Sequence, residues 1–166
     1  MSPYAALPLF LASALFQSTL LPRFSAFGFY PQLTLLMVIA WSLLRGPREG
    51  ALWGFMGGLA LDLLSGFALG FNALLLTMAG YFAGLGESRI FRSNFMLPIF
   101  LLSTLTLAYF SAELAVFNSL GRDLPWLASF FEVALPTLGL NLLCWPFVFR
   151  PLRWLSRITG REELRW

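Results

Sequence analysis

Long apolar segments separated by short polar stretches occupy most of this chain. Apolar runs of this length predict α-helices. A helix that crosses a bilayer needs about 20 residues, so the second and third segments are short for full spans and would lie low or thin the bilayer. The six segments cover residues 4–21, 32–44, 50–64, 70–85, 95–117 and 126–149.

The composition places these helices in a membrane. The chain is 58% hydrophobic and 11% charged, with a mean hydropathy of +0.76, whereas a soluble domain carries about 25% charged residues. No linker rich in Ser, Gly or charge divides the sequence. We therefore expect an all-α integral membrane protein, with a single bundle of six transmembrane helices over residues 1–149 and a basic cytoplasmic tail over residues 150–166.

The distribution of arginine predicts the orientation of the bundle. With six spans both termini lie on one side of the membrane, and nine of the 11 basic residues fall on that side. Only Arg23 and Arg122 fall on the other. Because short cytoplasmic loops retain basic residues, both termini are expected in the cytoplasm. No basic residue precedes the first segment, so we expect it to be a span and not a cleaved signal peptide.

The ionisable residues argue against an enzyme. The chain has no His, so the commonest general base is missing, together with any Ser–His or Cys–His nucleophile. Its single Cys144 lies in an apolar run and offers neither a disulfide nor a thiolate metal site. We expect no cofactor and no metal. The arginines form no patch on a soluble face, so nucleic acid is not an expected partner.

A line of small residues follows one face of the third segment. Gly50, Gly54 and Gly58 recur every four residues, and Asp62 continues the line. Small residues let another helix backbone approach closely, because lipid supplies no hydrophobic drive for helix association. Two interpretations stay open: an intramolecular seam of the bundle, which we favour, or the docking face for a helix of a partner.

Three acids fall within predicted spans: Asp62, Glu113 and Glu132. The predicted topology puts all three toward the outer leaflet. Buried acids are costly unless they are paired or hydrated, so they normally face the bundle or a wet cavity. Each acid could reach interfacial water or cap a neighbouring turn. Alternatively, the three could line an outward-facing polar cavity or a docking groove, and Asp62 would then matter most because it ends the glycine line.

A tight turn and a basic stripe complete the pattern. Ser65 and Gly66 are a turn signal between the third and fourth segments, which should pack as an antiparallel hairpin. In the tail, arginine recurs every four residues, which predicts an amphipathic helix on the cytoplasmic membrane surface that contacts anionic lipid. The stripe consists of Arg153, Arg157, Arg161 and Arg165.

Three motifs in order resemble the rod shape-determining MreD family. Gly58–Gly66 followed by Leu69-Gly70 is similar to that family's central motif. Phe110–Leu114 resembles its acidic helix, and Asn141 with Trp145–Phe149 resembles its final span. The resemblance covers nearly the whole chain in length, span count and topology. One departure is that the basic loops use only arginine, which does not affect the topology.

The resemblance implies a role that the residues alone do not give. MreD-like proteins are non-catalytic scaffolds or regulators of the elongation machinery that inserts peptidoglycan along rod-shaped bacteria, in the inner membrane. The implied partners are MreC, the glycosyltransferase RodA with its class B penicillin-binding transpeptidase, and MreB at the cytoplasmic face. The family fold is similar to the S components of energy-coupling-factor vitamin transporters, although a shared fold does not carry function with it.

The sequence is therefore compatible with two functions. The first is a scaffold in which Asp62, Glu113 and the glycine line form a groove for a transmembrane or juxtamembrane segment of a partner. The second is the capture of a small solute, such as a vitamin, in the manner of an S component. Against the second, the first segment lacks an Ala-x-x-x-Ala seam for a coupling subunit, and few Asn, Gln, Tyr or Trp lie at pocket depth.

Overall fold

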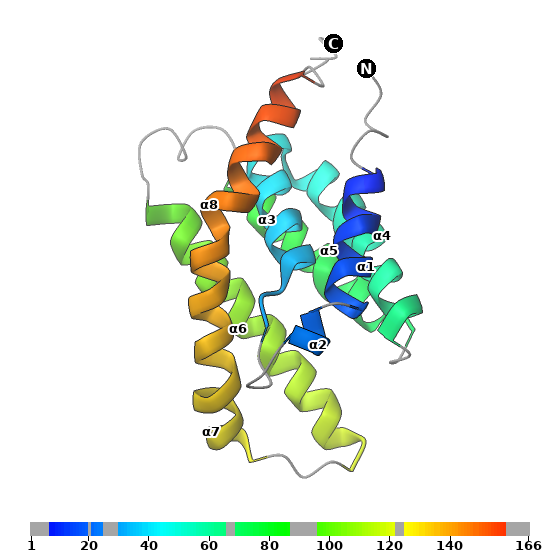
Figure 1. Cartoon of the computed structure of the whole chain (residues 1–166), viewed down its shortest axis with the longest axis vertical. Helices are drawn as coiled ribbons and strands as arrows, with labels where there is room; N and C mark the ends of the chain where they lie inside the picture. The colour runs from blue at the N-terminus through cyan, green and yellow to red at the C-terminus, as the bar shows by residue number, and fades with distance from the viewer. Residues whose placement is uncertain are drawn as a thin grey trace.

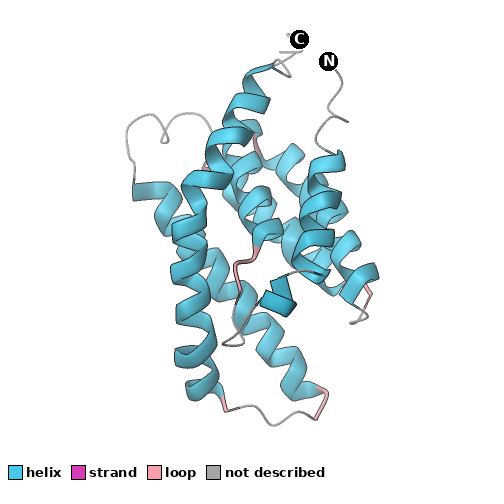
Figure 2. Ribbon diagram, viewed as in Figure 1, coloured by secondary structure: helices cyan, strands magenta, loops and turns pink. Residues whose placement is uncertain are grey.

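A computed structural model describes residues 7–19, 21–24, 30–65, 69–86, 96–121 and 125–158. This part of the chain is helical, with short loops and no strand (Figure 2). The elements are α1 (Leu7–Thr19), α2 (Leu21–Phe24), α3 (Leu33–Arg45), α4 (Pro47–Ser65), α5 (Phe71–Gly84), α6 (Met96–Ser119), α7 (Trp126–Ser129), the π-helix η2 (Phe130–Ala134) and α8 (Leu135–Ile158).

Each predicted apolar segment contains a helix, and the boundaries agree to within a few residues. Two details differ. The short helix α2 follows α1, and the last segment is one continuous helical rod of α7, η2 and α8 that extends to Ile158. The rod passes through the expected boundary between residues 149 and 150 without a break. The rest of the tail, with Arg161 and Arg165, lies outside the described residues.

Helix α3 is the centre of the bundle. Every residue from Thr34 to Leu43 is buried, and the helix contacts α1, α4, α5 and α8 (Figure 1). Its 13 residues extend about 20 Å at 1.5 Å per residue. Neighbouring helices therefore bury α3 on all sides, as expected of a helix that is hydrophobic all round.

Helix α6, with 24 residues, and the α7–α8 rod are the longest helices among the described residues. Among the described residues, these two are long and apolar enough to cross a membrane, over Met96–Ser119 and Trp126–Arg157. They extend past the start of α3 at the lower end of the view and diverge there, so their tips stand apart (Figure 1). The start of α1 and the end of α8 lie together at the opposite end.

Large apolar side chains are exposed around the outside of the bundle. Leu63 on α4 is 69% exposed, Leu74 on α5 61% and Phe100 on α6 67%. Soluble proteins rarely expose contiguous apolar surface on this scale, which marks a surface that contacts a membrane or other proteins.

Candidate functional site

Asp62 is buried and caps helix α5. The side chain is 1% exposed. Its Oδ2 accepts hydrogen bonds from the Gly70 and Ala73 N–H groups at 2.9 and 3.0 Å, and its Oδ1 accepts one from the Asn72 N–H at 3.0 Å. The first N–H groups of a helix have no partner within it and carry partial positive charge, so a carboxylate there is stabilising. Both carboxylate oxygens therefore accept hydrogen bonds from the start of α5. This agrees with the interpretation in which the acid caps a neighbouring turn.

The turn that makes the cap possible depends on glycine. Gly70 has φ of +93° and ends the turn in the left-handed region, where a side chain is unfavourable. Ser65 ends α4, and Gly66 lies outside the described residues. Helices α4 and α5 form the antiparallel hairpin that the turn signal predicts.

The glycine line of α4 packs inside the molecule. A Cβ added to Gly50, Gly54 or Gly58 would lie less than 3.0 Å from backbone atoms of α5. The blocking atoms belong to Gly80, Leu76 and the Asn72-Ala73 pair respectively. The two backbones are therefore in direct contact along the hairpin, and these three glycines form an intramolecular seam.

A series of polar contacts connects α5, the helix that Asp62 caps, to α6. Tyr109 is buried, and its hydroxyl donates a hydrogen bond to Asn72 Oδ1. Glu113 follows Tyr109 by one helical turn on α6, so the two side chains lie on the same face. Glu113 is half-buried. Asp62, Asn72 and Tyr109 thus form one buried network that joins α4, α5 and α6, and Glu113 lies one turn beyond it on α6.

A second network surrounds the start of α3. Asn141 on α8 is fully buried, and its Oδ1 accepts a hydrogen bond from the Gln32 N–H at 2.9 Å. Its Nδ2 donates to Thr106 Oγ1 on α6 at 3.2 Å. Gln17 on α1 caps the same helix, because its Oε1 accepts from the Thr34 N–H at 2.8 Å. Asn141 therefore links three helices at one point.

Sequence reasoning missed the partners in these networks. Thr106, Tyr109 and Glu113 are spaced by three and four residues, which places them on one face of α6, and this polar face could have been recognised in an apolar segment. Asn72 and Gln32 carry a weaker signal, a polar residue at the start of an apolar run. Their contacts depend on the tertiary arrangement.

Glu132 lies apart from both networks. It is exposed, within the π-helix η2. Pro136 has no N–H to donate to the Glu132 carbonyl, and its ring would collide with that carbonyl in a regular helix, so the widened turn accommodates the proline. Glu132 comes six residues after the start of α7, and Glu113 six residues before the end of α6. Along the helix axis, each acid is therefore about 9 Å from the tip of its own helix.

Arginines gather at the other end of the bundle. Arg45 lies 3.8 Å from Glu49 and stacks over the Trp41 ring at 5.3 Å. The exposed arginines at this end of the described residues are Arg48, Arg150, Arg153 and Arg157. The two ends of the bundle thus differ in charge.

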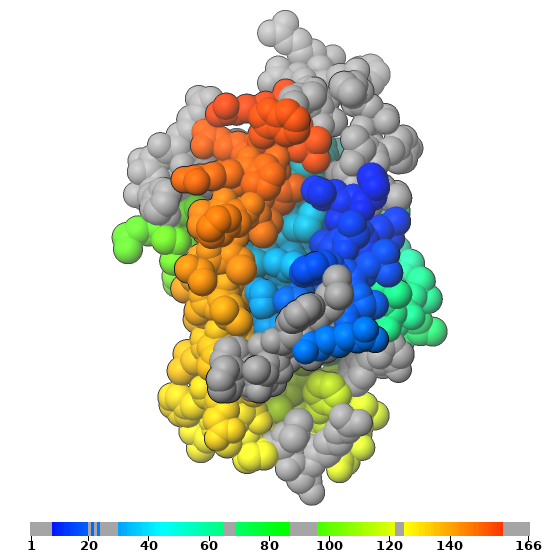
Figure 3. All heavy atoms as spheres, in the orientation of Figure 1, coloured from blue at the N-terminus to red at the C-terminus, as the bar shows by residue number. Residues whose placement is uncertain are grey.

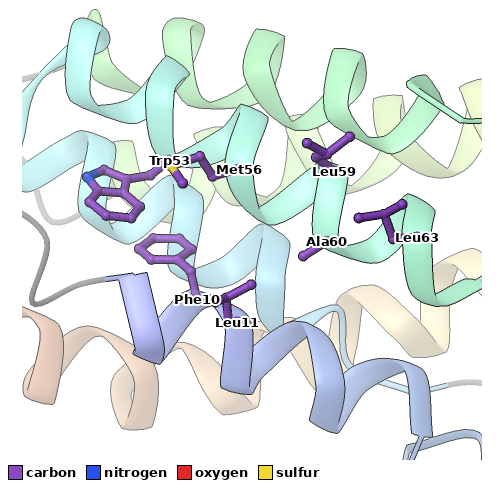
Figure 4. A pocket seen from close by; sticks show the side chains of 7 residues that line it. All are labelled: Phe10, Leu11, Trp53, Met56, Leu59, Ala60 and Leu63. Atoms are coloured by element: carbon purple, nitrogen blue, oxygen red, sulfur yellow. The ribbon is translucent and has the colours of Figure 1, made fainter.

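Two apolar grooves open on the outside of the part of the chain that the structure describes. One of about 170 Å³ lies between α1 and α4, where Leu11, Met56, Leu59 and Leu63 line it beside the stacked Phe10 and Trp53 rings (Figure 4). The other, of about 140 Å³, lies between α5 and α6. Both are lined almost wholly by carbon, so they suit aliphatic chains. Among the described residues no cluster of three or more His, Cys, Asp or Glu could hold a metal ion.

Comparison with known families gives one match. A family model described as rod shape-determining protein MreD matches residues 2–155 of the 166. No curated protein matches the chain, and no solved structure does either. The expected likeness to the S-component fold therefore has no structural match to support it and stays a prediction.

Proposed function

This chain belongs to the MreD family of rod shape-determining proteins, and on that premise we propose that it is a non-catalytic scaffold of the elongation machinery. The match over residues 2–155 carries the proposal, because it covers every described helix except the end of α8. Members of this family act in determining rod cell shape and are membrane-associated.

The proposed topology is six spans in the bacterial inner membrane with both termini in the cytoplasm. The apolar surface of the bundle supports it, because water would not tolerate so many exposed Leu and Phe side chains. The charge asymmetry supports the orientation, because Arg48, Arg150, Arg153 and Arg157 lie at the end that holds the start of α1. The same arginines would contact anionic lipid headgroups.

Cysteine labelling from one side of the membrane tests this topology. In a Cys144→Ser background, Ser119→Cys at the end of α6 should react with a membrane-impermeant maleimide added to spheroplasts. Ser156→Cys near the end of α8 should react only in inverted vesicles or after permeabilisation. The reverse labelling pattern, or labelling of both positions from one side, would contradict the proposed topology.

The proposed role is to hold MreC and the peptidoglycan synthase, RodA with its class B transpeptidase, in one complex, with MreB at the cytoplasmic arginine end. The diverging tips of α6 and the α7–α8 rod support docking on the outer side, where Glu113 and Glu132 lie. The glycine seam is filled by α5 and the Asp62 oxygens by the α5 cap. These residues would therefore support docking by shaping the bundle, without touching a partner.

Purification from native membranes in a mild detergent, followed by mass spectrometry, tests the scaffold role. We expect a single-span MreC-like protein, the glycosyltransferase and the transpeptidase to be retained in defined proportions. A tagged membrane protein of similar size and expression serves as the control for nonspecific carry-over. Retention of paired ATPases and a coupling subunit would instead identify a solute-capture component and contradict the scaffold.

A further inference from the structure

The outer surface of the α7–α8 rod presents an apolar face that no described element covers. Leu127, Phe131 and Leu143 are 76%, 61% and 66% exposed, and Leu135 and Gly139 between them are exposed as well. These five residues recur every four positions. The rod is open along much of its length on the front of the molecule (Figure 3).

The π-helix keeps these residues on one face. A spacing of four drifts by about 40° per step around a regular helix with 3.6 residues per turn. The wider turn of η2, in which the Leu135 N–H bonds to the Phe130 carbonyl, offsets part of this drift. Leu127 before the π-helix and Phe131 within it thereby lie closer to the face of Leu135 and Gly139, which follow it.

Gly139 is the glycine on this face, and it has no packing role inside the molecule. A Cβ added to Gly139 meets nothing within 4 Å, whereas every other glycine within a described helix would place a Cβ about 3.0 Å or less from a neighbour. Glycine inside a helix is less stable than alanine. A small residue that faces outward lets the backbone of a separate helix approach closely.

Glu132 follows Phe131 on the same rod, and its side chain is exposed. Within the described part of the chain, no cation lies within ion-pair distance of its carboxylate. An acid on an apolar surface at membrane depth is costly unless a donor or a cation satisfies it. The partner that fits this face therefore carries a basic side chain near the level of Glu132.

We propose that the face of Leu127, Phe131, Leu135, Gly139 and Leu143 docks one transmembrane helix of a partner protein, with an Arg or Lys of that helix paired to Glu132. The proposal rests on the scaffold function. It specifies the surface on which a partner binds and the charged pair that holds it there. A second copy of this chain does not fit. In a two-fold dimer through this face, Glu132 would meet Glu132, and Arg153 and Arg157 would meet their counterparts.

Photo-crosslinking in native membranes tests the proposal. A photoreactive amino acid is placed at Phe131 or Leu143 on the face, and at Phe82 on α5 as a control that is 49% exposed on another surface. Both face positions should crosslink to one transmembrane peptide, and mass spectrometry should place an Arg or Lys within two turns of its outer end. The control position should crosslink that peptide at least tenfold less.

Two substitutions test whether the crosslink depends on the small residue and on the acid of this face. Gly139→Leu should abolish the crosslink without loss of folded protein, because the added side chain points into open space. Glu132→Arg should reduce it about tenfold, and exchange of the basic residue on the crosslinked helix for Glu should restore it. Crosslinks to lipid alone, to a second copy, or to a helix without a basic residue would overturn the proposal. If the complex is recovered by purification while these crosslinks fail, the docking face is wrong and the scaffold stands.

Discussion

Leucine in place of Gly54 is expected to lower the thermal unfolding midpoint of the detergent-solubilised protein by about 6–12 °C. A Cβ at this position would lie less than 3.0 Å from the Leu76 carbonyl, which is backbone and cannot rotate away. The hairpin must then separate, and overpacking of this kind costs about 3 kcal/mol at the upper end of its usual range. For a chain of this size, each kcal/mol shifts the midpoint by about 2–4 °C.

Gly139→Leu is the matched control for this variant. It adds the same side chain to a glycine within a helix, but into open space. Its unfolding midpoint should equal that of the parent protein or rise by up to about 4 °C, because leucine is more stable than glycine inside a helix by up to about 1 kcal/mol. Equal midpoints for the Gly54 and Gly139 variants would show that α4 and α5 are not in backbone contact.

Alanine in place of Asp62 should destabilise the protein by about 2–4 kcal/mol. The carboxylate accepts three hydrogen bonds from the N–H groups of Gly70, Asn72 and Ala73. Alanine would leave the N–H groups of Asn72 and Ala73 buried without partners. A hydrogen bond to a charged group contributes about 1.5–3 kcal/mol. Because the three bonds share one carboxylate, the expected loss is less than their sum. The variant should also open α5 first, which hydrogen exchange of its first turn would detect.

Two further variants separate the cap from a simple loss of charge. Asp62→Asn keeps one acceptor oxygen and should lose about half as much stability. Glu132→Gln removes a charge from an exposed position and should leave the unfolding midpoint unchanged. If Asp62→Ala were as stable as the parent, the three hydrogen bonds would contribute nothing, and Asp62 would be open to a direct role with a partner.

The helices themselves follow from the apolar pattern. Six segments predict six helices because each run is long and apolar, and the spacing of Gly50, Gly54 and Gly58 correctly indicates a close-packed face. The intramolecular seam, the favoured of the two interpretations, is what the structure shows. The partner of that seam could also be inferred, since the turn after Ser65 is too short for anything but a neighbouring antiparallel helix.

The positions of the polar side chains could not be read from the same pattern. Asp62 and Glu132 are both single acids in apolar runs, yet one is buried under three N–H groups and the other is exposed. What separates them is the tertiary turn at Gly70 and the widened helix before Pro136. Neither leaves a periodic signal, because each depends on the backbone conformation at one or two residues.

The start of the central helix α3 is capped by a residue that is synthesised much later than the helix itself. The N–H of Gln32 is capped by Asn141, which the ribosome makes 109 residues later. At about 5–20 residues per second, several seconds pass before the second of the two side-chain caps at the start of α3 becomes available. During synthesis the polar start of this helix must be held by water, lipid headgroups or insertion machinery. Completion of the last helix is therefore the step that closes the core.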